Sequence, residues 1–142
     1  MKTVRQLLQA KSQGILSVTP ESTVFEALKV MADKGIGALL VLESGKLVGI
    51  LSERDYARKV ILKGKSSHDT PVREIMTDKV VYVQPGQTVE ECMALMTDKH
   101  IRHLPVFDGE RLVGVVSIGD LVKEVISQQE FIIKQLENYI MS

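Results

Sequence analysis

The 142-residue sequence has no tryptophan, only 4% aromatic residues and no excess of either charge. Its 18 lysines and arginines balance its 18 aspartates and glutamates, so the formal net charge is +0. A protein that binds nucleic acid or an acidic membrane through bulk charge normally carries a clear basic excess. We therefore expect neither a nucleic-acid partner nor a membrane partner.

Cysteine and long apolar runs are also scarce. The single cysteine, Cys92, excludes a disulfide within the chain. It lies on the apolar stripe of a predicted helix, so we expect a buried, inert thiol rather than a redox centre. No apolar run approaches the roughly 18 residues of a membrane span, and residues 1–6 lack the apolar core of a signal peptide. These absences predict a cytoplasmic location.

An internal repeat is the strongest feature that the sequence does have. A shift of 65 positions superposes identical residues without a gap between positions 18 and 56: Pro20 and Pro85, Thr23 and Thr88, Met31 and Met96, Val41 and Val106, Gly49 and Gly114, Ser52 and Ser117, and Asp55 and Asp120. Each copy is then one supersecondary unit that buries its apolar face best against its twin. We predict two halves around a pseudo-twofold axis, with two equivalent clefts where small molecules bind.

Each copy predicts the element order β-α-β-β-α. A short strand at 15–18 or 80–83 leads into a helix that begins at a Thr-x-x-Glu capping box, Thr23 or Thr88. Two apolar runs separated by a polar turn predict a hairpin, and a second helix begins at Ser52 or Ser117. A short helical turn, 4–8 or 72–76, precedes each copy. The fold class is therefore α/β (α+β), with two such repeats and a C-terminal amphipathic helix.

These patterns divide the chain into four segments. Residues 1–62 form the first repeat, 63–71 an exposed linker without periodicity, 72–127 the second repeat and 128–142 the C-terminal helix. His68 should be solvated in the linker. The helix has apolar residues at helical spacing, so it needs a surface to cover: its own domain or an identical chain, or else a different partner.

A Gly-x-x-Ser-x-x-Asp motif closes each hairpin, at Gly49 to Asp55 and at Gly114 to Asp120. Its simplest interpretation is structural, because Ser-x-x-Asp is a capping box. In the functional interpretation the serine hydroxyl and the first-turn N–H groups face a phosphate. The aspartate then accepts the hydroxyls of a ribose, as acidic residues do in other nucleotide sites. The duplication of the motif favours ligand binding.

With Ile101 to Val106 on the middle strand, these tandem motifs resemble a pair of CBS (cystathionine β-synthase) domains, a Bateman module. The resemblance covers the chain up to the start of the C-terminal helix. It implies adenosine-containing ligands, such as AMP, ADP, ATP, NAD or S-adenosylmethionine, in the clefts between repeats.

The resemblance also implies which residues line each cleft. In the first, phosphate and ribose lie at one motif and adenine between strands of the other repeat, which assigns to it Ser52, Arg54, Asp55, Arg58, Lys79, Val80, Ile101, Arg102, His103 and Pro105. The second cleft has the corresponding residues Gly14, Ile15, Ile36, Gly37, Ala38, Ser117, Gly119 and Asp120.

The two clefts should differ in charge. The first gathers three arginines and His103, whereas the second has Gly119 in place of Arg54 and Gly37 and Ala38 in place of Arg102 and His103. We expect a pyrophosphate-bearing ligand, NAD or ADP/ATP, in the basic cleft, and AMP or nothing in the neutral one. The alternatives are a solvated helix face for Arg54 and Arg58, and a satisfied core-edge histidine for His103.

Catalysis is not expected. The sequence has no Cys/His pair on matching elements, no metal-ligand cluster and no Walker loop. We predict a regulatory module without a metal, which senses an adenine nucleotide as effector and signals in trans, as a homodimer, to an unknown regulated protein. A ligand-free scaffold or oligomerisation protein of the same fold is the alternative. Nucleic-acid binding through Arg54, Arg58, Lys59 and Arg102 is a weaker one.

Overall fold

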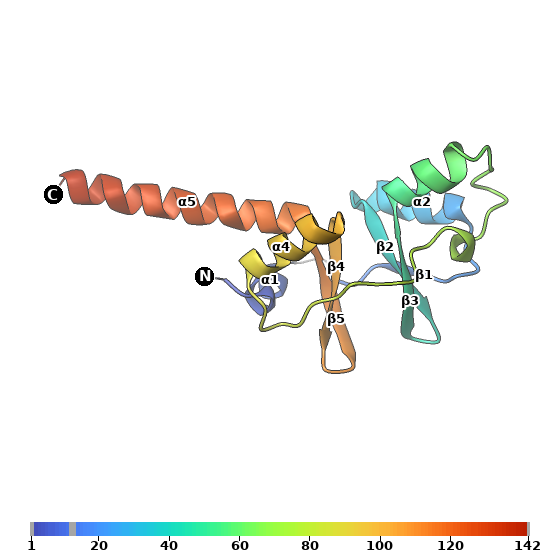
Figure 1. Ribbon diagram of the computed structural model, residues 1–142, viewed down its shortest axis with the longest axis horizontal. Coiled ribbons are helices and arrows are strands. Elements are labelled where there is room, and N and C mark those ends of the chain that lie inside the picture. The colour runs from blue at the N-terminus through green and yellow to red at the C-terminus, as the bar shows by residue number, and fades with distance from the viewer. Residues whose placement is uncertain (1, 12–13, 142) are drawn as a thin grey trace. The chain divides into compact units, whose positions relative to one another are not determined.

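The computed structural model describes residues 2–11 and 14–141, and the chain divides into two compact units. The central unit comprises residues 14–81, and the terminal unit comprises residues 1–13 together with 82–142 (Figure 1). Mixed α/β structure with the order β-α-β-β-α confirms the predicted fold class.

The central unit contains a three-stranded sheet with helices around it. Its strands follow the order β1-β2-β3, with β1 (Ser17–Val18) parallel to β2 (Ala38–Glu43) and β2 antiparallel to β3 (Lys46–Ser52). Helix α2 (Val24–Lys34) connects β1 to β2, and α3 (Glu53–Tyr56) follows β3 and continues as a π-helical turn, η1 (Ala57–Ile61). A 3₁₀ turn, η2 (Val72–Glu74), lies at the predicted turn 72–76.

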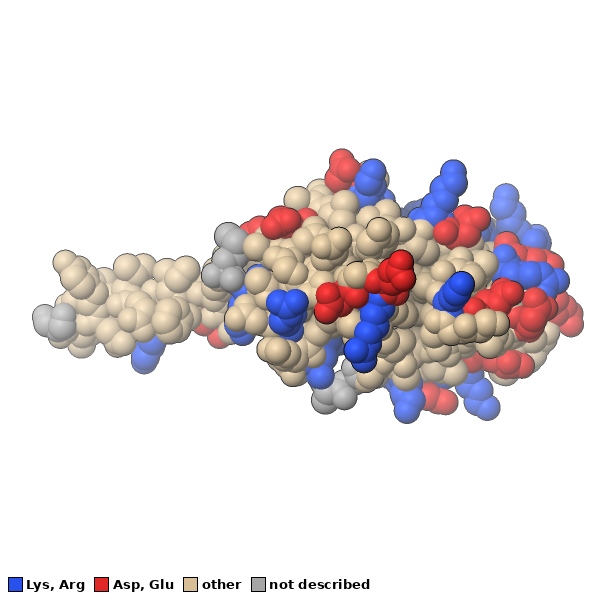
Figure 2. All heavy atoms as spheres, turned by 90° about the horizontal axis from the view of Figure 1, so that it is seen from below, with Lys and Arg blue, Asp and Glu red and all other residues tan. Residues whose placement is uncertain are grey.

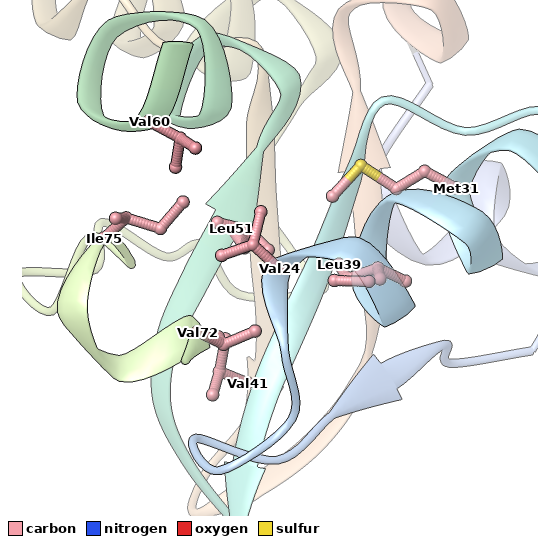
Figure 3. Close-up of a cluster of buried hydrophobic side chains, with 9 residues drawn as sticks. Val24, Met31, Leu39, Val41, Leu51, Val60, Val72 and Ile75 are labelled. Carbon is pink, nitrogen blue, oxygen red and sulfur yellow. The ribbon is translucent and has the colours of Figure 1, made fainter. Parts of the chain in front are cut away.

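A cluster of aliphatic side chains forms the core of the central unit (Figure 3). The predicted apolar face of α2 is buried, with Val24 and Ala27 fully inaccessible to solvent. The cluster joins this face to the sheet, η1 and η2 through Leu39, Val41, Leu51, Val60, Val72 and Ile75. Burying each aliphatic side chain of this size contributes about 1.5–3 kcal/mol, so the core rather than any ion pair stabilises the unit.

The terminal unit contains a second copy of the hairpin and of the two helices that flank it in the sequence. It contains α1 (Val4–Ala10), α4 (Val89–Lys99), β4 (His103–Asp108), β5 (Arg111–Ser117) and α5 (Ile118–Met141). The strand predicted at 80–83 is reduced to one parallel bridge between Val83 and Val106. In the central unit the N–H of Leu40 donates to Leu16, and the residue equivalent to Leu40 is Pro105, which has no N–H to donate.

The leading turn of each sequence repeat packs in the unit of the other repeat. The N–H of Val4 donates to Gln87 and that of Arg5 to Pro85, both at the start of the second repeat. In the same way, the N–H of Val72 donates to Ser22 in the central unit. The sequence repeats and the compact units are therefore two different divisions of the chain.

The predicted local signals are largely confirmed. The hairpin turns contain residues with positive φ, Ser44 and Gly45 in one copy and Gly109 in the other, as tight turns require. Thr88 and Glu91 form a complete capping box. Thr23 accepts a hydrogen bond from the N–H of Glu26, but the reciprocal half of that box is not found between these two residues, so the prediction of a full box there was wrong.

The linker prediction was only partly right. Residues 63–71 contain no helix or strand, as expected, but Thr70 is buried and its hydroxyl donates to the Ser66 carbonyl at 2.7 Å. His68 is exposed, and its ring stacks on Phe25 with a centroid distance of 4.0 Å. The linker is therefore anchored at its end. The predicted C-terminal helix is part of α5, a continuous helix of 24 residues.

Candidate functional site

The first Ser-x-x-Asp motif lies where β3 ends and α3 begins. Asp55 accepts hydrogen bonds at Oδ2 from the backbone N–H of Ser52 at 3.0 Å and from its hydroxyl at 3.1 Å. In return, the N–H of Asp55 donates to Ser52 Oγ at 3.2 Å. This is a complete capping box, so the structural interpretation of the motif is confirmed.

The other carboxylate oxygen of Asp55 faces a lysine and a threonine. Lys59 Nζ lies 3.1 Å from Oδ1, one helical turn further on, and also donates to the carbonyl of Ile75 at 2.9 Å. The Thr77 hydroxyl donates to Oδ1 at 3.4 Å. The side chain of Asp55 is only 13% exposed. A charge with so little contact with water needs a compensating partner, and Lys59 provides it.

The second motif has the same cap with a different lysine. Asp120 Oδ2 accepts from the backbone N–H of Ser117 at 2.9 Å, and the N–H of Asp120 donates to Ser117 Oγ at 3.1 Å. Lys11, directly after α1, places Nζ 2.9 Å from the same Oδ2 and 2.9 Å from the carbonyl of Val115. Each motif is therefore an aspartate that caps its own helix and pairs with a lysine.

The folded chain lowers the pKa of the Asp120 carboxyl. Burial raises its pKa, but the hydrogen bond from the Ser117 N–H and the contacts with Lys11 outweigh burial, and the pKa of the carboxyl lies below its ordinary value. Near neutral pH this site presents a carboxylate.

His103 lies beside the second motif. It pairs with Ser117 across the β4–β5 ladder. Burial lowers its pKa, the positive charges of Lys11 and Arg102 lower it further, and Asp120 acts in the opposite direction. His103 therefore favours the neutral imidazole, which is the behaviour of the core-edge histidine that was left open as an alternative.

Several predicted site residues come together within each unit. Ala38 pairs with Ser52, and the N–H of Glu53 donates to Gly37, so residues 37–38 adjoin the Asp55 motif. Likewise the N–H of Ile118 donates to Arg102, so residues 102–103 adjoin the Asp120 motif. The distribution of these residues between two clefts stays a prediction.

The remaining predicted residues differ in exposure. Those with exposed side chains or backbone are Gly14, Ile15, Arg58, Lys79, Arg102 and Gly119. Those of intermediate exposure are Ile36, Arg54, Val80 and Ile101. Pro105 is buried, and its carbonyl accepts from the N–H of Val83 at 3.0 Å, so its contact in the structure is a sheet contact.

Sequence reasoning missed three residues that contact the motifs: Lys11, Lys59 and Thr77. Lys59 had a signal, because it is four residues after Asp55 on the same helix. Lys11 had none, because it is 109 residues from Asp120. The expectation of a neutral second cleft did not include this lysine, whose charge is paired with that of Asp120, and it stays a prediction.

The part of the chain that the structure describes contains neither a cluster of metal ligands nor a membrane-spanning helix. Within residues 2–11 and 14–141, no three histidine, cysteine, aspartate or glutamate side chains are grouped so that they could hold a metal ion. Among the same residues, no helix combines the length and the apolar character needed to span a bilayer.

The chain is a tandem-repeat α/β protein. Each repeat is a β-α-β-β-α unit with a Ser-Asp pair at the start of its last helix, and comparison with known proteins identifies the family. The CBS domain family model matches residues 4–62 and 72–127. The chain belongs to the CBS domain family, with two tandem copies.

Individual relatives agree with this assignment. CBSX3, a mitochondrial CBS domain-containing protein of Arabidopsis thaliana, is 39% identical over 147 residues, which span 97% of this chain and 71% of that protein. A solved CBS-domain structure from Burkholderia ambifaria MC40-6 is 56% identical, with a TM-score of 0.87, and the match covers 90% of this chain and 96% of that one.

One similar structure contains ligands. The CBS domain pair of protein MJ0100 was solved in complex with 5′-methylthioadenosine and S-adenosyl-L-methionine. It is 26% identical to this chain with a TM-score of 0.80, and the match covers 90% of this chain and 98% of that one.

Proposed function

We propose that this chain is a regulatory module that binds an adenosine-containing ligand, AMP, ADP, ATP or NAD, at its two Ser-x-x-Asp motifs. The observation that carries the proposal is the duplicated carboxylate: Asp55 and Asp120 are each partly buried at the start of a helix and each paired with a lysine. The adenosine compounds bound by the CBS pair of MJ0100 support the same ligand class.

The chemistry of each motif suits a nucleotide. The helix dipole favours negative charge at the start of the following helix. A phosphate there would have to replace present partners of the donors, because the Ser52 hydroxyl donates to Asp55 and the N–H groups of Glu53 and Ile118 donate to Gly37 and Arg102. The aspartate supplies acceptors for the two ribose hydroxyls. Because Lys59 and Lys11 already contact these carboxylates, the ribose would have to compete with a lysine at each motif.

The basic residues then select the number of phosphates. We propose that Arg54, Arg58 and Arg102 favour a pyrophosphate-bearing ligand, because each charge-assisted hydrogen bond contributes about 1.5–3 kcal/mol. At the second motif the charge of Lys11 is paired with that of Asp120, so we propose that AMP or no ligand is favoured there.

Binding becomes regulation through a shift in population. A ligand that binds one arrangement of the two units better than another stabilises that arrangement by its difference in affinity. We propose that this change is transmitted in trans, from a homodimer of this chain to a regulated protein.

Calorimetry with AMP, ATP, NAD and S-adenosylmethionine tests the proposal. Asp55→Asn and Asp120→Asn retain an oxygen that can cap the helix, but lose the charge and one acceptor for ribose. Each should weaken binding at its own motif about 10- to 100-fold, since a hydrogen bond to a charged group is lost. Asp108→Asn, the same change on an exposed hairpin residue, is the matched control and should leave affinity unchanged.

If none of these ligands binds the wild-type chain, the regulatory function is wrong. A scaffold of the same fold would then be favoured, since the exposed apolar residues of α5 provide a surface that requires no ligand. If ligands bind and both asparagine variants match the wild type, the motifs are structural caps and the ligand binds elsewhere.

A further inference from the structure

From Ile126 onward, α5 exposes a row of large apolar side chains. Their exposed fractions are high for aliphatic and aromatic residues: Ile126 50%, Ile132 53%, Ile133 55%, Leu136 57%, Tyr139 81% and Ile140 78%. In Figure 2 the end of α5 that leads to the C-terminus is mostly free of lysine, arginine, aspartate and glutamate. Such a row on a helix marks an interaction surface.

The spacing of these residues forms one stripe. Gln129, Ile132, Leu136 and Tyr139 are separated by three, four and three residues, which is the heptad spacing of a two-helix seam. Ile126, Ile133 and Ile140 repeat every seven residues alongside it. We call these seven residues the α5 seam.

The charged residues of this half of α5 lie outside the seam. At about 100° of rotation per residue, Glu130 and Lys134 project from another face of the helix, and Glu137 lies at the border of the stripe. The seam itself contains one polar residue, the uncharged Gln129. Two copies of the seam can therefore meet without bringing like charges together.

The first half of α5 is anchored, whereas the second half is not packed within its own unit. Leu121 is fully buried, and Glu124 pairs with Lys2 at 3.2 Å. Residues 129–141 are all exposed. Because this half continues a helix whose first half is already formed and held, pairing with another helix would not require a new helix to be nucleated.

The exposed area is large enough for a pair of identical helices. The seam and its neighbours expose on the order of 800 Å² of mostly apolar surface, which is about what one partner contributes to a standard stable interface. An uncharged stripe of this size is complementary to a second copy of itself, so a partner for it does not require a groove or an opposite charge on a different protein.

We propose that the α5 seam packs against the same seam of a second copy of this chain. This inference rests on the homodimer of the proposed function and assigns its surface to α5, at residues that, except for Ile126, lie beyond residue 127 where the family match ends. The seam begins six residues after Asp120 and includes no residue of either Ser-x-x-Asp motif, so dimer formation and ligand binding can be measured separately.

Sedimentation equilibrium of the full chain tests the proposal. The double variant Ile132→Lys, Leu136→Lys places two charges in the seam, and its dimer dissociation constant should rise about 100-fold or more. The matched control, Phe131→Lys with Asn138→Lys, adds the same charges to exposed positions on the opposite side of α5 and should dimerise like the wild type. Both pairs of positions are exposed, so neither variant should affect folding, which circular dichroism checks.

The outcomes separate the two proposals. A wild-type chain that is monomeric at all concentrations overturns both the seam and the homodimer. A seam variant that dimerises as tightly as the wild type overturns the seam alone and places the dimer on another surface. Calorimetry on the same samples reports ligand binding, so a failure of the ligand proposal is seen independently.

Discussion

Lys11 and Asp120 are 109 residues apart in the chain and form an ion pair at 2.9 Å. The equivalent aspartate, Asp55, pairs instead with Lys59 on its own helix. In the second repeat the position equivalent to Lys59 is Glu124, so no lysine is available four residues after Asp120. Lys11, which directly follows α1, pairs with Asp120 instead. Both aspartates therefore have a lysine partner, although the two lysines are not at equivalent positions of the repeat.

The first prediction concerns the Lys11–Asp120 pair and stability. Lys11→Met should lower the free energy of unfolding at pH 7 by about 1 kcal/mol, since a partly exposed ion pair is worth less than a buried one. The folded-state pKa of Asp120 lies below its unfolded value. Its contribution is therefore present above the unfolded pKa and lost as pH falls through the folded pKa.

Denaturant unfolding at pH 7 and at pH 3 measures this effect. The difference between wild type and Lys11→Met should shrink at the lower pH. Lys2→Met, which removes a lysine that is 51% exposed and paired with Glu124, should have a smaller effect at pH 7. An equal loss at both pH values would show that Lys11 acts through packing and not through the charge of Asp120.

A second prediction uses His103 as a reporter of the same site. Its pKa is lowered by burial and by Lys11, and is raised by Asp120. Lys11→Met should therefore raise the pKa of His103, whereas Asp120→Asn should lower it further. NMR titration of the imidazole measures both. Shifts of the same sign in the two variants would contradict this electrostatic account.

The third prediction concerns the glycines of the two motifs. A Cβ on Gly49 would lie 2.7 Å from Met76 Sδ and 3.0 Å from the Thr77 carbonyl oxygen, whose backbone is held by the bridge to Ile50. On Gly114 the three atoms nearest to the Cβ would all belong to the Leu8 side chain, the first at 2.8 Å. Gly49→Ala should destabilise the chain by about 1–3 kcal/mol, and Gly114→Ala by less, because a leucine side chain can move.

Thermal or denaturant unfolding compares these variants. Gly119→Ala is the control, because its Cβ would meet only Ser117 Oγ at 3.6 Å, an ordinary contact, and alanine favours the helix. It should be neutral or stabilising. A Gly114→Ala variant less stable than Gly49→Ala would show that Leu8 is more rigidly held than Met76 and Thr77.

The fourth prediction concerns Cys92. The side chain is fully buried, and burial, with a smaller effect of Glu91, raises the pKa of the thiol to about 11. Since the thiolate is the reactive form, the native chain should react with a disulfide reagent at pH 8 at least 100-fold more slowly than the chain unfolded in urea. Equal rates would mean that α4 opens readily.

Local structure was predictable because its causes are local. The hairpins follow from apolar runs around polar turns, and the burial of Val24, Ala27 and Met31 follows from their spacing on α2. Both Ser-x-x-Asp caps were predictable for the same reason, since the atoms that bond are three residues apart. One missed effect had a visible cause: Pro105 has no N–H, which shortened the strand predicted at 80–83.

The sequence by itself determined the repeat, the element order and the two helix caps that contain Asp55 and Asp120. The elements and the caps depend on residues within a few positions of one another, and the repeat is visible in the sequence directly. Only the tertiary structure decided that α1 packs in the unit of the second repeat, that Lys11 reaches Asp120 and that Thr70 is buried. These features depend on which distant surfaces pack together, and a short stretch of sequence carries no information about a partner a hundred residues away. The lysine that pairs with Asp120 is therefore supplied by the fold rather than by the motif.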